Sequence, residues 1–533
     1  MYFFYRKNCS HLNICPLLIV AIHLTLTSAE TQCLNVNTSK IEISFIQNLN
    51  LNISINYETS LIEYFYDIMP CTNLEIAVVN IPDTSHFIVF QVHSYLYNVT
   101  INHIPQNITS KPILGTNIGL VHVILDKSGS TSFNVSNQNS FPISIFSAVL
   151  SYGRNTPIPG GCNMEFEVKT APFMKISYNS SIVQVDAQPA RLPGPWISFF
   201  MPPCTPNILN YESYILYQPY GNYSKENYFN LISKMLTLER IKQNGRKVTS
   251  PSLRPALRRK FSSYYGVGRV YALVVGGSNM DYSSYVPIHT YACDPEFFEQ
   301  FMIFSYVNSI ILGGCGLWLY ITATNYEQKT FTIIFGTMIA VATSIAMSFA
   351  NTASEFLESD DAVFLIVPGF LLSAKLYSTL SCGGSQPKLV ASFFNSLALG
   401  ILFACVAFYT PLSDQPICSD PAQYWGIFGI VVLLSMIVLL CIDKSDRIPP
   451  IFIGSYAIVI SLENWVHSNL RYVVFNPLRK VTEEGFATIS SPPYQIVDYL
   501  MLCLWVALCV IRLCINNKRN VLQMTPGPDY KTF

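Results

Sequence analysis

The pattern of apolar and polar positions changes once along this 533-residue chain, near residue 298. Before that point, apolar residues come in short runs that are rich in β-branched and aromatic side chains and are separated by turn-forming residues. After it, long uncharged apolar runs recur to the C-terminus. Short runs of the first kind are typical of strands, whereas a helix needs roughly 20 apolar residues to cross a bilayer. We therefore expect a membrane protein with an exported β-rich half followed by a bundle of transmembrane helices.

The β-rich half extends over residues 34–295. Residues 86–93 (HFIVFQVH) have strand character, and residues 41–55 and 118–125 resemble them. Repeated short strands separated by turns predict β-sandwiches. The length fits a tandem β-sandwich-like ectodomain, with a first domain at 30–170 and a second at 171–297. One helix is expected inside the second domain, at residues 228–240.

Seven segments of the second half are long and apolar enough to cross a membrane. Glu463 lies inside one of them, and Asp498 and Arg512 lie at the two ends of another. Together the segments predict a seven-helix domain over residues 298–515 and a short cytosolic tail over 516–533. The segments are 300–324, 330–354, 362–381, 389–413, 421–442, 448–470 and 495–515.

Residues 1–29 have the organisation of a signal peptide, with Arg6 and Lys7 before an apolar run and small residues at the cleavage site. An uncleaved signal anchor is the alternative. An exported N-terminus followed by seven crossings places the C-terminus in the cytosol, and most loop charges agree with this orientation.

One loop disagrees with that orientation. Residues 471–494 should lie outside the cytosol, yet they carry Arg471, Arg479 and Lys480. We expect this loop to fold as a lid or an interfacial segment; otherwise the number of spans is wrong there.

Glycosylation triplets of the form Asn-x-Ser/Thr occur throughout the exported half and stop before residue 298. Such acceptors mark lumenal or extracellular surface. The candidate sites are Asn37, Asn52, Asn98, Asn107, Asn134, Asn179 and Asn222.

Cysteines of the mature exported half lie in an oxidising compartment, where disulfides form. Five cysteines there give two disulfides and one odd thiol, and a sixth in a loop on the same side could complete three pairs. Their connectivity stays open. The candidates are Cys33, Cys71, Cys162, Cys204, Cys293 and Cys418.

No pattern of catalytic or metal-binding residues emerges from the sequence. His467 is the one histidine of the membrane half, which argues against a histidine-rich zinc site, and no Gly-x-Ser-x-Gly motif occurs. Asn476-Pro477-Leu478-Arg479 differs from the Asn-Pro-x-x-Tyr motif of G-protein-coupled receptors. We therefore expect no enzyme, no cofactor and no metal.

Charge adds two questions. The chain is 50% hydrophobic and 12% charged with a net charge of zero, so the balance of charge gives no sign of nucleic-acid binding. Glu463 is either a polar site within the bundle or a wet carboxylate one turn from the outer interface. The basic stretch 240–260 is either a solvated loop or a patch for an anionic ligand.

Two blocks of the ectodomain are distinctive: residues 157–166 (PIPGGCNMEF) and residues 285–293 (YVPIHTYAC). With residues 86–100 (HFIVFQVHSYLYNVT), 408–412 (FYTPL) and 454–456 (GSY), they make the chain resemble the transmembrane 7 superfamily member 3 family. The resemblance extends over nearly the whole chain. The short tail after Arg519 and the basic stretch depart from it.

This resemblance implies a glycosylated, seven-pass protein of the plasma membrane that passes through the endoplasmic reticulum. It also implies a non-enzymatic role in cell survival and in the response to protein-homeostasis stress. A ligand-binding seven-helix signalling receptor is the alternative, followed by a transporter or channel that uses Glu463. The bilayer is the one partner implied, and protein partners stay open.

Overall fold

The computed structural model describes most of the ectodomain and the C-terminal part of the membrane half. The described residues are 37–45, 59–104, 112–124, 129–162, 172–178, 182–192, 209–219, 222–248, 257–264, 267–278, 280–291, 309–310, 312–321, 387–418, 420–441, 448–466, 468–482, 485–486 and 494–524. Several predictions lie outside these residues: the signal peptide, Asn52, Asn107, Asn179, Cys33, Cys204, Cys293, and the spans 330–354 and 362–381.

The first β unit is a sandwich of two sheets. One sheet has the order β1 (Asn37–Ser44), β3 (Thr72–Val79), β8 (Thr131–Asn137), β5 (Val99–Ile104) and β6 (Ile113–Gly115), with β1 parallel to β3. The other has the order β2 (Thr59–Ile68), β9 (Ile143–Gly153), β4 (Ser85–Ser94) and β7 (Asn117–Val123). Ile43, Ile76, Phe90 and Phe133 are fully buried in the core between them.

Strand β4 confirms the strand expected at residues 86–93. Eight consecutive residues of β4, from Phe87 to Ser94, are buried. A strand covered on one face alternates between buried and exposed positions, so an unbroken buried run means that both faces are covered. One face packs in the sandwich core, and the other faces the second β unit.

In its described residues, the second β unit contains three sheets and two helices. Its sheets are β10 (Ile158–Gly161) with β13 (Ala190–Arg191); β11 (Met174–Tyr178), β12 (Ile182–Ala187) and β16 (Arg259–Ser262); and β15 (Arg246–Lys247), β14 (Asn210–Tyr217), β17 (Arg269–Gly277) and β18 (Met280–Ser284), with β19 (Ile288–Thr290) also on β17. Because β10 pairs with β13, this unit begins soon after β9 ends at Gly153, earlier than the boundary expected near residue 170.

The single helix expected at residues 228–240 is instead two helices, α3 (Lys225–Ser233) and α4 (Leu238–Asn244). Ser224 caps the first, because its Oγ accepts a hydrogen bond from the Asn227 amide, and Thr237 caps the second in the same way. The cap at Thr237 starts a new helix within the stretch that was expected to be continuous.

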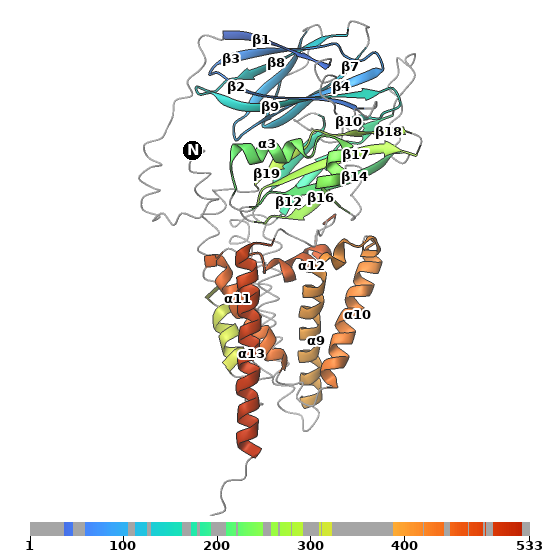
Figure 1. Cartoon of the computed structure of the whole chain (residues 1–533). Coiled ribbons are helices and arrows are strands. Elements are labelled where there is room, and N and C mark those ends of the chain that lie inside the picture. The colour runs from blue at the N-terminus through green and yellow to red at the C-terminus, as the bar shows by residue number, and fades with distance from the viewer. Residues whose placement is uncertain are drawn as a thin grey trace, which may run out of the picture.

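Both helices pack between the two β units (Figure 1). Phe146 and Ala148 of β9 share one buried cluster with Phe229 and Ile232 of α3 and with Val274 of β17. The two units are therefore joined by a common apolar core, and not only by the chain that connects them.

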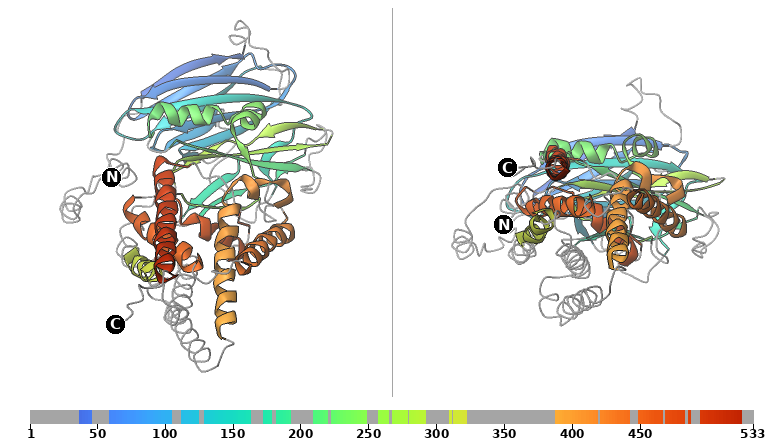
Figure 2. Two further views of the ribbon diagram at one scale, coloured as in Figure 1. Left: turned by 60° about the horizontal axis from the view of Figure 1, so that its bottom comes forward. Right: turned by 90° about the horizontal axis from the view of Figure 1, so that it is seen from below.

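The membrane half contributes the helices α9 (Pro387–Phe408), α10 (Pro421–Leu440), α11 (Ile448–Val466), α12 (Tyr472–Thr482) and α13 (Ile496–Met524), two short 3-10 turns, η2 (Pro411–Asp414) and η3 (Pro416–Cys418), and a helical segment at Leu312–Ile321. Figures 1 and 2 place them on one side of the β-rich part. Helix α13 continues past residue 515, where the last span was expected to end.

Two described helices, Pro421–Leu440 and Ile496–Asn517, are long and apolar enough to cross a membrane. Leu312–Ile321, Asn395–Phe408 and Ile448–Glu463 are shorter apolar helices. Ile430, Leu434 and Val438 leave the outer side of α10 apolar and exposed, as lipid contact requires. The count of seven spans stays a prediction.

Candidate functional site

The most distinctive site is the junction between the second β unit and the membrane helices, where α12 lies beneath β16 (Figure 1). Ser262, at the end of β16, donates a hydrogen bond to Asn476 Oδ1 at 2.6 Å. Its hydroxyl oxygen accepts one from Arg479 Nη1 at 2.8 Å. All three side chains are buried. A hydrogen-bonded polar cluster therefore joins residues that are more than 200 positions apart in the sequence.

Aromatic contacts extend this junction. The rings of Tyr264 and Tyr472 meet edge to face with centroids 4.7 Å apart, and the Tyr472 hydroxyl donates to the Ser263 carbonyl. Asn476 Nδ2 donates to the Tyr264 hydroxyl at 3.3 Å. Burial raises the pKa of Tyr264 well above its ordinary value, so its hydroxyl stays neutral.

A buried arginine fixes the β side of the junction. Arg269 of β17 is fully buried and donates to the carbonyls of Ser262 at 2.6 Å and Tyr264 at 3.0 Å. It thereby holds the segment that follows β16 in the shape that meets α12.

The structure excludes one of the two roles expected for Glu463. Its side chain is 1% exposed, so it is not a wet interfacial carboxylate. Its Oε1 accepts from Arg471 Nε at 2.9 Å and its Oε2 accepts from the Arg471 amide at 3.1 Å. Because Arg471 directly precedes α12, the ion pair ties α11 to the start of α12, and both carboxylate oxygens are engaged.

The unexpected bases of the loop 471–494 each have a partner. Arg471 pairs with Glu463, and Arg479 bonds Ser262 and lies 5.6 Å from the centre of the Tyr472 ring. The Lys480 ammonium lies 4.4 Å from the centre of the Tyr424 ring, a cation–π distance. The described part of this loop thus contains a helix, α12, that packs between β16 and α9–α10. This arrangement resembles the lid that was one of the expectations.

Asp498 has a structural role at the start of α13. Its carboxylate accepts hydrogen bonds from the backbone N–H of Asn469 at 2.7 Å and from the backbone N–H of Gln495 at 2.9 Å. A carboxylate that accepts two backbone amides beside a helix start acts as a cap. It holds the turn before α12 against α13.

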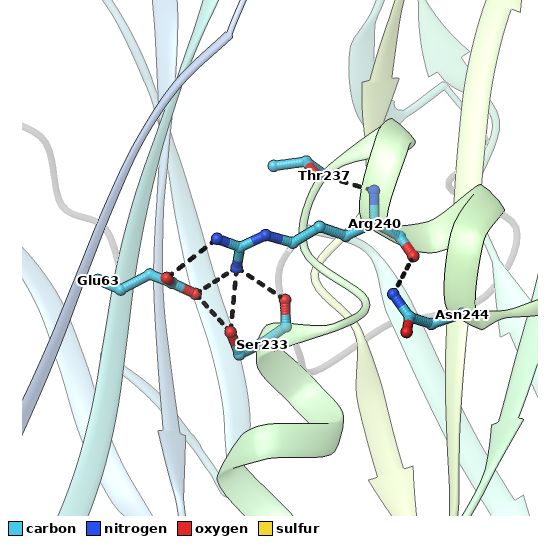
Figure 3. A network of polar contacts seen from close by, with 5 residues as sticks. All are labelled: Glu63, Ser233, Thr237, Arg240 and Asn244. Carbon is cyan, nitrogen blue, oxygen red and sulfur yellow. Dashed lines mark hydrogen bonds and ion pairs between the residues drawn. The ribbon is translucent and has the colours of Figure 1, made fainter. Parts of the chain in front are cut away.

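A second polar site joins the two β units (Figure 3). Arg240 of α4 donates through Nη1 to Glu63 Oε1 of β2 at 2.7 Å and to Ser233 Oγ at 3.0 Å. Ser233 in turn donates to Glu63 Oε1 at 2.7 Å.

The basic stretch 240–260 therefore does not form one patch in its described part. Arg240 pairs with Glu63, Lys247 with Glu212, and Arg258 with Asp186. The three ion pairs are distributed over different strands. Three of the seven described cations that suggested an anionic ligand are therefore paired with carboxylates.

Buried histidines lie close to the same interface between the β units. His93 contacts Asn117 Oδ1 at 2.9 Å, and His289 contacts Gln218 Oε1 at 3.0 Å. Tyr228 of α3 lies between them, since it donates to Asn117 Oδ1 at 3.0 Å and its ring centre is 4.8 Å from that of His289. Burial lowers the pKa of His93 to about 4 and that of His289 to about 3.

Two of the candidate cysteines, Cys71 and Cys162, are disulfide-bonded. Cys418 departs from expectation, because its thiol is free and buried in an apolar cluster with Phe408 and Tyr424. Packing inside that cluster, rather than exposure in a loop, explains the difference.

The candidate glycosylation sites in the described residues differ in exposure. Asn98 and Asn222 are exposed, and Asn134 is half-buried in β8. Asn37 begins β1. No group of three or more His, Cys, Asp or Glu side chains suited to a metal ion occurs within the described ranges.

Comparison with known proteins agrees with this architecture. A family model described as "TM7SF3-like, N-terminal immunoglobulin-like domain" matches residues 64–152, and one described as "TM7SF3-like, second immunoglobulin-like domain" matches residues 157–296. Transmembrane 7 superfamily member 3 from Homo sapiens is 25% identical over 485 residues, which cover 84% of this chain and 80% of the relative. The chain belongs to the transmembrane 7 superfamily member 3 family. The relative of the same name from Mus musculus is 25% identical over 480 residues, which cover 84% of this chain and 81% of that relative.

Membership in this family makes the chain a membrane protein with two N-terminal immunoglobulin-like domains. The matched ranges meet between residues 152 and 157, where β9 ends and β10 begins. A solved structure of Ruminococcus gnavus β-glucuronidase is 7% identical, and the match covers 42% of this chain and 34% of that chain; its TM-score of 0.14 is too low to indicate a shared fold.

Proposed function

We propose that this protein is a non-enzymatic, seven-pass membrane glycoprotein that supports cell survival when protein homeostasis in the secretory pathway is disturbed. Its immunoglobulin-like domains face the lumen or the cell exterior, and they act on the membrane helices through α12. The observation that carries the proposal is the direct contact between β16 and α12, made by Ser262, Asn476 and Arg479.

This contact favours coupling between the two halves. Asn476 and Arg479 are buried polar groups whose partner, Ser262, lies in the other half. Leaving buried polar groups without partners costs about 1–3 kcal/mol for each group. A displacement of β16 therefore has to move α12 as well or bear that cost.

A ligand-binding signalling receptor would use the same coupling, and it is the second candidate. Ligand-evoked activation of G proteins would favour it. A transporter or channel that depends on Glu463 is less well supported, because both oxygens of this carboxylate are engaged by Arg471. Proton-coupled or ion-coupled flux would favour that candidate.

The test compares variants of the junction in cells that lack the protein and are exposed to an inhibitor of the endoplasmic-reticulum calcium pump. Wild type should restore survival, whereas Asn476→Ala and Arg479→Met should reach the membrane and fail to restore it. Arg258→Met is the matched control, because Arg258 pairs with Asp186 inside the second β unit. Full protection by junction variants at wild-type surface levels would refute coupling through α12.

Location and orientation need their own test. An epitope placed after Asn520 should be detected only in permeabilised cells, while the ectodomain should be labelled on intact cells. Glycosidase treatment should shorten the protein, with every modified asparagine before residue 298. Detection of the tail epitope on intact cells would rule out the proposed orientation.

A further inference from the structure

A cavity of about 470 Å³ opens between the two β units, beside the edge strand β2. Its walls come from β2 and β9 of the first unit and from α3 of the second. Clefts of this size between domains are common ligand sites. Neither the junction at α12 nor the proposed coupling involves it.

The floor of the cavity is an aromatic platform. Phe65 is 61% exposed, although its ring stacks on Phe146 with centroids 4.7 Å apart and meets the edge of Phe229 at 5.8 Å. A phenylalanine ring held in place and left open to water suits a ligand with an apolar face.

The rim of the cavity is polar and of mixed charge. Asp67 and Glu226 offer carboxylate acceptors, Lys225 offers an ammonium donor, and Asn230 offers both a donor and an acceptor. Lys225 Nζ also donates to Ser144 Oγ at 2.9 Å, and Ser144 donates to Asp67. A site for an ion would carry one sign of charge. Donors and acceptors around an aromatic floor suit a neutral ligand with many hydroxyl groups, which is a saccharide.

A glycosylation triplet next to the cavity could supply such a saccharide. Asn222-Tyr223-Ser224 is a glycosylation triplet, Asn222 is exposed, and the cavity residues Lys225 and Glu226 follow it directly. Three residues of chain span at most about 11 Å. Tyr95 also links the triplet to the cavity wall. Its hydroxyl donates to the Tyr223 carbonyl, and its backbone amide donates to the carbonyl of the cavity residue Ser144 at 3.4 Å.

We propose that the N-glycan of Asn222 folds back into this cavity, with its inner sugar rings on Phe65 and its hydroxyl groups on the rim. The glycan then covers the seam between the two immunoglobulin-like domains and binds both of them. Held in this way, it is shielded from the processing enzymes of the Golgi.

The test is site-resolved mass spectrometry of glycopeptides from the full chain expressed in mammalian cells. The glycan on Asn222 should be predominantly oligomannose, while that on Asn98, which is exposed in the connection between β4 and β5, should be predominantly processed. Phe65→Ser should shift Asn222 to processed forms and leave Asn98 unchanged. Asn230→Ala is a milder variant of the rim that should shift Asn222 in the same direction if Phe65→Ser folds poorly.

Thermal unfolding of the detergent-solubilised protein gives an independent readout. Asn222→Gln should lower the unfolding temperature of wild type and have little effect in the Phe65→Ser background, because the two changes remove one shared interaction. Asn222→Gln is preferable to Ser224→Ala, since Ser224 also caps α3.

Several results would overturn the proposal. They are an unmodified Asn222, equal processing at Asn222 and Asn98, or equal effects of Asn222→Gln in both backgrounds. If a polypeptide occupies the cavity instead, Phe65→Ser should leave the processing of the Asn222 glycan unchanged and alter the set of proteins that co-purify with the chain. That result would also contradict the proposal.

Discussion

At the scale of single residues, Glu463 illustrates how far a sequence pattern reaches. An acidic residue in an apolar span predicts an unusual environment, and the side chain is indeed buried. Its partner could not be predicted in the same way. Arg471 lies in the next segment, and only the turn between α11 and α12 brings its guanidinium and its amide to the carboxylate.

This pairing leads to a prediction for stability. Glu463→Leu should lower the free energy of unfolding by up to about 3 kcal/mol, because Arg471 loses its carboxylate while it stays mostly buried. The double variant Glu463→Leu/Arg471→Leu should recover most of the loss, since replacing both charges with apolar groups is often neutral. Thermal unfolding in detergent would measure both, and equal losses in the single and double variants would contradict the ion pair's role.

The buried histidines predict a dependence of stability on pH. The pKa values of His93 and His289, about 4 and about 3, lie below the ordinary histidine value of about 6.5. The unfolded chain therefore binds more protons as the pH falls below about 6.5, and the stability that is present above this pH is lost progressively towards about pH 4. At about pH 5, each histidine should cost about 2 kcal/mol of stability.

Unfolding temperatures measured between about pH 7.5 and about pH 5 would check this. His93→Gln and His289→Gln should each flatten the pH profile, because glutamine keeps a polar side chain that does not titrate. Profiles parallel to that of wild type would show that other groups govern the loss.

At the scale of elements, long apolar helices and buried strands were easier to predict than short polar helices. The strand at residues 86–93 is apolar because it is covered on both faces, and such a run is visible in the sequence. Helix α12 lacks the long apolar run of a span, because it has 11 residues and contains Pro477 and two bases, Arg479 and Lys480. Contacts with Ser262 and Tyr264, about 200 residues away, stabilise it there, and no local pattern reports them.

Helix α3 provides a prediction about its cap. Ser224→Ala removes the hydrogen bond to the Asn227 amide and should cost about 1 kcal/mol beyond any loss seen in Asn222→Gln, which removes the glycosylation triplet but keeps the cap. Ser224→Thr keeps both features and is the matched control. Unfolding free energies from chemical denaturation would resolve the difference. No excess loss in Ser224→Ala would exclude a role for the cap.

At the scale of the whole molecule, the sequence predicted two β units but placed their boundary too late. Residues 157–161 were expected within the first domain, yet β10 belongs to the second unit through its pairing with β13. The shared core was also invisible to the sequence, because it brings together β9, α3 and β17 from both units.

This shared core predicts that the two immunoglobulin-like domains unfold together. Ile232→Ala, at a fully buried position of the common cluster, should cost about 2–5 kcal/mol and separate the melting of the two domains. Ile43→Ala deletes the same atoms from the core of the first domain alone, so it should destabilise without adding a second step. Limited proteolysis of the full chain along a temperature gradient would distinguish one transition from two.

The partners of the bases in α12 also bear on biosynthesis. Arg479 is accommodated by Ser262, which lies in a domain that the ribosome completes long before α12 emerges. Domains of a growing chain fold in order from the N-terminus. In the orientation proposed above, the finished ectodomain would serve as a template for α12, whose charges otherwise disfavour a place outside the cytosol. The proposed orientation thus implies that the placement of the last helices depends on prior folding of the ectodomain.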